Sequence, residues 1–364
     1  MIKQLFSMDE VNRGRQKELD LARGFAMLFM ILIHAYTELY LDDIGPTKYD
    51  AIVHFLGAPP AAPVFMFLLG IGIVYSKKST PKELFRRGGT LFFLGYILNF
   101  LRDYVPDIII ANQEQDMELA LQAWDWLWSV DILAFAGLTF IFFGLVKRFK
   151  LNNWFLAAFW GICTTLNMFL QGVIVENETL NIVCRLIWTT DEYTWFPFLI
   201  WITYPIFGYF FGQLFIRCSN KDKFYTSLLM GSIIVSIPLW CYSYINTIRF
   251  GAFGSADQLF DYEYFNHDLI GEFVIIAFVL FWLSICYFMT KFMPQVIFKH
   301  FERWSKNNLQ IYCVHWLIIG FIGLTIEIKH FSALNAFIAG IAILLIADGI
   351  VVLINKLKAT RLSK

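Results

Sequence analysis

Apolar residues run along this 364-residue chain in ten stretches, which short polar segments separate. A helix of about 20 apolar residues crosses the hydrocarbon core of a bilayer. The pattern predicts an all-α polytopic membrane bundle of about ten transmembrane helices, with a short interfacial or re-entrant piece near residues 180–190. The expected spans are residues 21–41, 55–76, 84–102, 126–146, 151–175, 195–216, 224–246, 270–290, 308–326 and 332–355.

The charged residues give these spans a direction. With the N-terminus in the cytoplasm, the inner segments hold 24 of the 29 Lys and Arg residues, as the positive-inside rule requires. We therefore expect both termini in the cytoplasm, residues 1–20 as a cytoplasmic N-terminal segment, and residues 1–364 as one membrane domain. The polar N-terminus lacks the apolar core of a cleavable signal peptide, and no large outer domain is expected, which favours a bacterial cell membrane.

Composition supports the membrane class and limits the cofactors. The chain is 58% hydrophobic and 16% charged, against about 25% charged in an average soluble protein. The six cysteines show neither a CxxC motif nor Cys/His ligand spacing, so no metal site is expected. The lipid bilayer is the expected surrounding, no nucleic-acid partner is expected, and the oligomeric state stays open, a homo-oligomer included.

Two polar side chains stand out in the first span. Arg23 and His34 are eleven positions apart, which is three helical turns plus about 20°, so both leave the same face. Their axial separation is about 16 Å, half of the hydrocarbon core. An ionisable residue inside a span is a functional hypothesis by default. The alternatives are that Arg23 is an ordinary membrane anchor and that His34 only hydrogen-bonds to a neighbouring helix.

The surroundings of this pair resemble a known family. The segment Glu18–Gly24 (ELDLARG), with ten residues between Arg23 and His34, resembles the R-x10-H signature of the transmembrane acyltransferase superfamily. That superfamily includes acyltransferase family 3 and the relatives of heparan-α-glucosaminide N-acetyltransferase. Four further segments are similar to its motifs and follow in the same order: His54–Gly70, Leu84–Gly88, Val130–Leu133 with Gly137 beyond it, and Asn308–His315. Leu69, where family 3 usually carries a serine, favours the glucosaminide branch.

The resemblance implies acetyl-CoA as the acyl donor, used as a co-substrate. Arg23, Arg86 and Arg87 form a basic cluster at the cytoplasmic edge, together with Lys77, Lys78 and Lys82. Guanidinium groups suit the phosphates of CoA. The pantetheine arm then extends inward towards His34, over a distance comparable with the axial separation of Arg23 and His34. The alternative for Arg86 and Arg87 is that they only mark the cytoplasmic side.

His34 is a candidate general base that takes a proton from a sugar hydroxyl or amine. It can instead accept the acyl group covalently before passing it on. His54 competes for the catalytic role, because the lysosomal branch of the family has Asn at the first-helix position and its critical His just before the second helix. The sequence alone does not choose between the two histidines.

Four further residues are weaker candidates. Asp131 is a candidate for acceptor binding or for orienting a histidine, with helix capping as the alternative. Tyr312 and His315, one turn apart, are candidates for lining the cofactor tunnel, although His315 is equally interpreted as a satisfied core histidine. Glu38, one turn beyond His34, is a candidate for orienting it or binding the acceptor.

The preferred interpretation is a membrane-bound acyltransferase that moves acetyl from cytoplasmic acetyl-CoA to an extracytoplasmic carbohydrate or amino-sugar acceptor. The main alternative is a secondary transporter that uses intramembrane His and Asp residues. Against it, the sequence shows no paired broken helices and no two-half symmetry. A non-catalytic membrane assembly factor is a further alternative, which would not need the line from Arg23 to His34.

Overall fold

The computed structural model describes residues 5–40, 48–245, 262–267, 269–325 and 330–362. Within these ranges every regular element is a helix, and extended pairing is limited to three isolated bridges. The all-α prediction is confirmed. In chain order the elements are α1 (Lys17–Leu39), α2 (Lys48–Gly57), α3 (Ala62–Tyr75), α4 (Pro81–Asn99), the π-helix η3 (Phe100–Tyr104), α5 (Val105–Glu114), α6 (Met117–Leu127), α7 (Ile132–Arg148), α8 (Asn153–Leu170), α9 (Glu178–Arg185), α10 (Phe198–Trp201), α11 (Thr203–Phe215), α12 (Lys221–Ile245), α13 (Tyr262–Phe265), α14 (Leu269–Phe292), α15 (Gln295–Lys306), α16 (Asn308–Ile322) and α17 (Ala333–Leu362).

Six helical stretches among the described residues are long and apolar enough to cross a membrane. They are Lys17–Leu39, Ile52–Tyr75, Asn153–Leu170, Phe198–Phe215, Leu269–Phe292 and Ala333–Arg361. The expected count of ten is not confirmed. The other four predicted spans fall on α4, α7, α12 and α16: α7 and α16 have only 17 and 15 residues, and α4 carries charged side chains in its first turns. The short piece expected near residues 180–190 forms the eight-residue helix α9.

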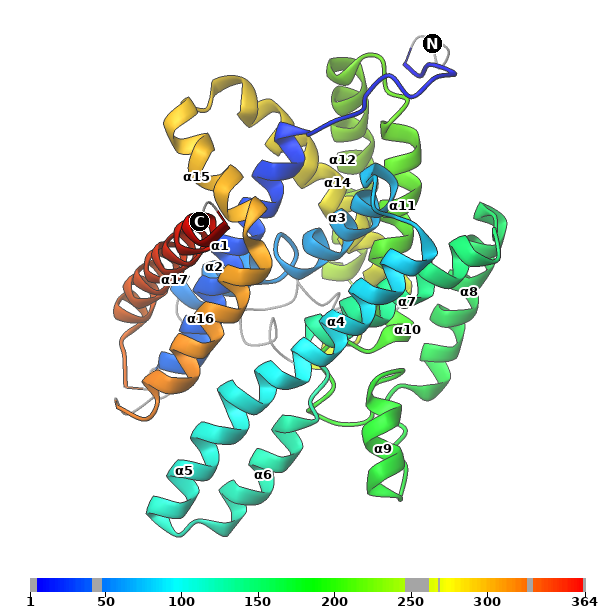
Figure 1. The fold of residues 1–364 in the computed structure, drawn as a ribbon. Helices are drawn as coiled ribbons and strands as arrows, with labels where there is room; N and C mark the ends of the chain where they lie inside the picture. Colours follow the sequence, from blue (N-terminus) through cyan, green and yellow to red (C-terminus); the bar gives the residue numbers. More distant parts are fainter. Residues whose placement is uncertain (1–4, 41–47, 246–261, 268, 326–329, 363–364) are drawn as a thin grey trace.

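Helix α1 lies in the left half of Figure 1 and packs against α2, α3, α14, α15, α16 and α17. Its apolar residues are buried on nearly all sides. A helix that is hydrophobic all round is suited to the interior of a large helical protein. The two candidate residues on α1 therefore lie inside the protein and not on its lipid-facing surface.

Helices α4 and α7 pack together with little room between their backbones. A Cβ atom added to Gly137 would lie 2.8 Å from the carbonyl oxygen of Gly88 and 2.7 Å from the backbone nitrogen of Phe92. Small residues at such crossings let membrane helices approach closely. The pair forms one rigid wall of the cavity described below.

The π-helix η3 continues α4 into α5 and carries Arg102 into the protein. The side chain of Arg102 is only 8% exposed. A π segment inserted into an α-helix shifts the register of the side chains and is frequent at functional sites. The backbone of η3 also touches α16, because a Cβ on Gly320 would lie 2.2 Å from the carbonyl oxygen of Arg102.

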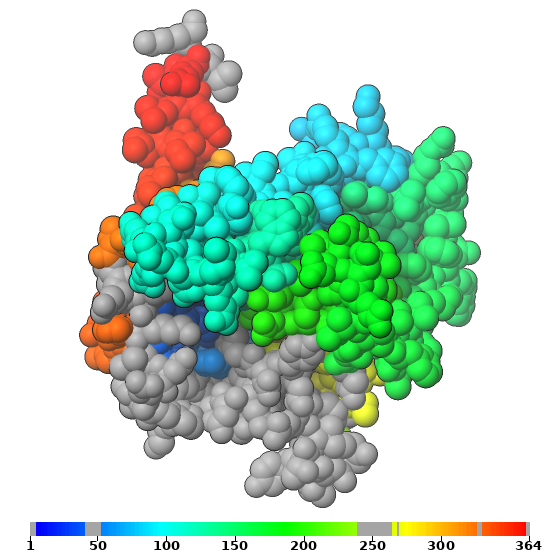
Figure 2. All heavy atoms as spheres, turned by 90° about the horizontal axis from the view of Figure 1, so that it is seen from below, coloured from blue at the N-terminus to red at the C-terminus, as the bar shows by residue number. Residues whose placement is uncertain are grey.

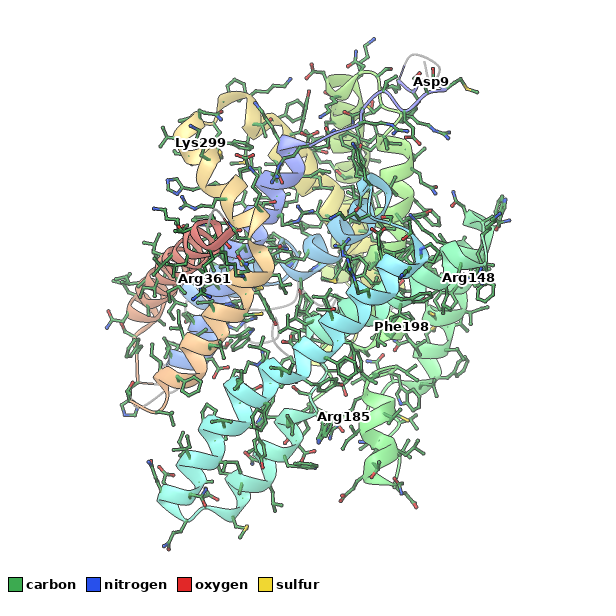
Figure 3. All side chains as sticks on the ribbon, viewed as in Figure 1. Asp9, Arg148, Arg185, Phe198, Lys299 and Arg361 are labelled. Carbon is green, nitrogen blue, oxygen red and sulfur yellow. The ribbon has the colours of Figure 1, made fainter. Side chains whose placement is uncertain are left out.

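Figure 3 shows Asp9 and Lys299 in the upper part of the molecule, Arg148 and Arg361 at mid-height, and Arg185 in the lower half. Seen from below in Figure 2, α5 and α6 (cyan) and the green segment that includes α9 cover much of the lower face. The upper end holds α15 and the N-terminal segment, which is expected in the cytoplasm.

Candidate functional site

A cavity of about 520 Å³ lies between α1, α3, α4, α7 and α16. Pockets for small ligands and cofactors commonly have volumes of about 300–1,000 Å³. Its walls are mostly apolar, and its strongly polar side chains are three arginines. The lining residues include Arg23, Met27, Met30, Phe65, Gly72, Ser76, Arg86, Arg87, Thr90, Leu91, Ile132, Leu133, Ala136, Phe140, Asn308, Leu309 and Tyr312.

The structure brings Arg23, Arg86 and Arg87 to one cavity, although α1 and α4 are separated by 41 residues of chain. Thr80 and Glu83 form a capping box that starts α4 one turn before these arginines. The guanidinium of Arg87 lies 4.4 Å above the ring of Phe140 on α7, a cation–π contact that holds it at the cavity wall. The three arginines of the expected basic cluster therefore line one half-open cavity, in which Arg86 and Arg87 remain solvent-exposed.

Arg23 keeps hydrogen-bonding capacity towards the cavity. Asp20 accepts two bonds from Arg15, at 2.5 and 2.9 Å, and a third from the Ser305 hydroxyl at 2.8 Å. Arg23 itself donates to the Ser305 hydroxyl at 3.1 Å and lies 3.8 Å from the Asp20 carboxylate. Since Arg15 already pairs with Asp20, much of the charge of Arg23 is left for a ligand.

His34 is held by two consecutive residues of α16. Its Nδ1 lies 3.0 Å from Nε2 of His315. Its ring also stacks on Trp316, with ring centroids 4.2 Å apart and planes inclined by 29°. His315 is fully buried, whereas His34 is partly exposed. His34 is therefore the more accessible of the two rings, and neither histidine is among the residues that line the cavity of the three arginines.

A buried polar network continues from this pair. The Tyr312 hydroxyl donates to Oδ2 of Asp131 at 2.6 Å, and Arg102 Nη1 donates to the same oxygen at 3.0 Å. The other oxygen of Asp131 accepts from the backbone N–H of Ile132 at 2.6 Å and so caps α7. Asp131 thus does act as a helix cap, the alternative that the sequence left open, and its carboxylate is committed to three protein donors.

Arg102 connects the network back to the histidines. Its guanidinium lies 4.2 Å above the Trp316 ring on which His34 stacks, and its Nε donates to Asp103 at 2.8 Å. None of Arg102, Trp316 and Ser305 is among the candidate residues predicted from the sequence, although Trp316 directly follows His315.

His54 lies on α2 and contacts a different part of α1. Its ring packs edge-on against Tyr36, with centroids 5.9 Å apart and planes at 83°. Tyr36 is two residues beyond His34, which is about 200° around a helix, so His54 and His315 approach α1 from different sides. Glu38 follows one turn beyond His34 and is partly exposed. Among the described contacts, His34 pairs with His315 and not with His54.

The comparison with protein families finds a match over more than half of the chain. The model described as heparan-alpha-glucosaminide N-acetyltransferase, catalytic, matches residues 15–242. The match includes Arg23, His34 and His54, and it ends within α12, so that α16 with His315 lies beyond it. It corresponds to the glucosaminide branch of the superfamily and does not bear on acyltransferase family 3. The comparison with curated proteins finds no match.

Proposed function

The chain belongs to the family of the heparan-alpha-glucosaminide N-acetyltransferase catalytic domain, and from this premise we propose that it transfers acetyl across a membrane. The family implies acetyltransferase activity in an integral membrane protein. In the proposal the donor is cytoplasmic acetyl-CoA, and the acceptor is a hydroxyl or amine of an extracytoplasmic carbohydrate. Arg23, Arg86 and Arg87 hold the phosphates, and His34 acts at the acetyl group.

The observation that carries the proposal is the cavity that three arginines share. Its charged side chains come from the expected cytoplasmic end of α1 and α4, while its apolar walls are formed by α3, α7 and the first turns of α16. An anionic nucleotide with a long uncharged arm fits this distribution of charge, because arginine binds phosphate bidentately and the arm needs no charged partner. Tyr312 lies at the cavity wall one helical turn before His315.

His34 supplies the base in this proposal. Its imidazole takes the proton of the acceptor hydroxyl or amine as that atom attacks the thioester carbonyl carbon. The new acyl bond forms, the bond between carbon and sulfur breaks, and the proton on His34 passes to the departing thiolate. A covalent acetyl on His34 is the second route, in which the imidazole nitrogen attacks first and the acceptor takes the acetyl group afterwards.

His54 stays the competing candidate for the base. It lies within the matched region, and among the described contacts its ring packs against Tyr36. Substituting each histidine separately distinguishes the two. If His34 is the base, His34→Ala abolishes transfer while His54→Ala retains at least part of it, and the opposite result assigns the role to His54.

The proposal is tested with the purified full-length chain in lipid nanodiscs. Acetyl-CoA hydrolysis, acetyl transfer to amino sugars and CoA binding are measured for the wild type, His34→Ala and Arg23→Ala. Arg13→Ala is the matched control, because Arg13 is an exposed cation of the same N-terminal segment, 71% exposed and paired with Glu10. We expect Arg23→Ala to weaken CoA binding and His34→Ala to stop turnover with binding retained.

Two results would overturn the proposal. The first is an absence of CoA binding and of turnover in the wild-type chain. The second is solute uptake into sealed vesicles without acyl-CoA, which would favour the transporter. Equal behaviour of Arg23→Ala and Arg13→Ala would remove Arg23 from the donor site.

A further inference from the structure

The proton on His315 can be located from its surroundings. Nδ1 of His315 lies 3.3 Å from the backbone carbonyl oxygen of Ile311, one turn earlier on α16. A carbonyl oxygen only accepts hydrogen bonds, so Nδ1 carries the proton. The ring is fully buried, and burial disfavours the doubly protonated, charged form. A neutral imidazole with its proton on Nδ1 presents a lone pair at Nε2.

The contact between the two histidines is a hydrogen bond in the ring plane. The planes of His34 and His315 differ by 10°, and the ring centroids are 5.3 Å apart while the facing nitrogens are 3.0 Å apart. The rings therefore meet edge to edge, with each nitrogen pointing at the other, and do not stack face to face. Such a bond needs one donor and one acceptor. Because Nε2 of His315 is the acceptor, Nδ1 of His34 is the donor.

We propose that His315 is a positioning residue that fixes the tautomer of His34, with the proton on Nδ1 and the lone pair on Nε2. The consequence for catalysis rests on the proposed function, in which His34 is the base. The Ile311 carbonyl accepts a hydrogen bond from Nδ1 of His315, and Nε2 of His315 then accepts one from Nδ1 of His34. The backbone carbonyl therefore determines the tautomers of both rings. In a histidine the hydrogen bond at one ring nitrogen, often to a backbone carbonyl or a carboxylate, sets which nitrogen carries the proton. His315 takes the place of that carboxylate here.

The remaining contacts of His34 leave Nε2 available. Within the described part of the chain, His315 is the only hydrogen-bond partner of the His34 ring, and the ring is partly exposed. Trp316 stacks on its face and restricts its rotation. A ring held at one nitrogen and on one face presents its second nitrogen in a constant direction. That is the property a general base needs.

Ring-nitrogen NMR tests the tautomer without any activity assay. The full-length chain labelled with ¹⁵N-histidine contains six histidines, and the spectrum of His34→Gln identifies the signals of His34 in membranes at neutral pH. We expect a protonated Nδ1 and an unprotonated Nε2 for His34, and a coupling across the bond to His315. A protonated Nε2 on His34 would overturn the proposal.

Two variants at position 315 connect the tautomer to turnover. His315→Gln retains an acceptor for His34 and a donor for the Ile311 carbonyl, whereas His315→Leu has neither. We expect His315→Leu to lower kcat about tenfold or more with CoA affinity retained, since a positioned base contributes about 10²–10⁴-fold. His315→Gln restores kcat to within a few-fold and keeps the His34 signals of the wild type. Equal kcat in His315→Leu and the wild type would overturn the positioning role.

The two measurements separate this inference from the proposed function. If the spectrum shows the expected tautomer and no variant or wild type transfers acetyl, the proposed function fails and the tautomer stands. If the wild type is active and His34 carries its proton on Nε2, the proposed function stands and the inference fails. The wild-type spectrum needs no substitution at position 315, so a folding defect in His315→Leu does not affect it.

Discussion

The hydroxyl of Tyr312 donates to the carboxylate of Asp131 over 2.6 Å, which ties α16 to the first turn of α7. Arg102 donates to the same carboxylate oxygen from η3. Three elements that are far apart in the chain therefore meet at one buried carboxylate. Because Tyr312 and His315 lie on the same helix, this junction also sets the position of the histidine that pairs with His34.

The first prediction concerns the charge of Asp131. Asp131→Asn retains the shape of the side chain but removes the ion pair with Arg102, whose side chain is only 8% exposed. Breaking a buried pair typically costs about 3–5 kcal/mol. We expect a smaller loss here, because Asp103 still pairs with Arg102. Thermal unfolding in detergent measures the change as a lower Tm.

Asp103→Asn is the matched control, because Asp103 pairs with the same arginine but is 22% exposed and caps no helix. Its Tm is expected to fall less than that of Asp131→Asn. A larger loss for Asp103→Asn would contradict the central role assigned to Asp131.

The second prediction separates the ring of Tyr312 from its hydroxyl. Tyr312→Phe retains the ring that lines the cavity and loses the bond to Asp131. A hydrogen bond to a charged group contributes about 1.5–3 kcal/mol. We expect a lower Tm with the affinity for CoA changed less than about threefold, as measured by calorimetry. A large loss of CoA affinity with an unchanged Tm would show instead that the hydroxyl contacts the ligand.

The third prediction concerns the phosphate site. Arg86→Ala and Arg87→Ala each remove a guanidinium from the cavity wall, and we expect the Kd for CoA to rise about tenfold or more, given about 1.5–3 kcal/mol for a charged hydrogen bond. Arg148→Ala serves as the control, because Arg148 is an exposed arginine of α7 outside this cavity. Isothermal titration calorimetry measures the Kd for CoA of all three variants. Equal Kd values in the three variants would assign Arg86 and Arg87 to membrane topology alone.

The fourth prediction tests the close crossing of α4 and α7. Gly137→Ala places a methyl group against the backbone of α4, and overpacking of this kind costs about 1–3 kcal/mol. Because both helices line the cavity, we expect a lower Tm together with weaker CoA binding. Gly89→Ala is the control, since a Cβ at Gly89 has no atom within 4 Å. Gly89→Ala is expected to leave the CoA affinity unchanged and to leave the Tm unchanged or raise it slightly.

The fifth prediction concerns orientation in the membrane. Lys77 lies between α3 and α4 on the expected cytoplasmic side, and Gln113 lies near the end of α5 on the expected outer side, and both are exposed. A membrane-impermeant maleimide added to intact cells is expected to label Gln113→Cys at once and Lys77→Cys only after permeabilisation. The reverse labelling pattern would invert the proposed direction of transfer.

Local patterns in the sequence predicted the helices and the basic half of the candidate site. The apolar stretches became helices because backbone groups in a bilayer need internal hydrogen bonds, which a helix supplies locally. The clustering of Arg23, Arg86 and Arg87 was predicted from the distribution of charged residues, because the positive-inside rule places basic helix ends on the same side of the membrane. The expected count of ten spans is not confirmed, because the lengths of α7 and α16 and the charges of α4 depart from the standard span.

The sequence by itself determined that Arg23 and His34 share one face of α1, because helical periodicity relates residues within a single element. Only the tertiary structure decided what that face meets. His34 and His315 are 281 positions apart, and no periodicity relates two helices so distant in the chain. Their pairing depends on side-chain packing around α1 and on the buried junction at Asp131. The partners of the histidine were therefore decided by the assembly of the helices and not by the pattern within any one of them.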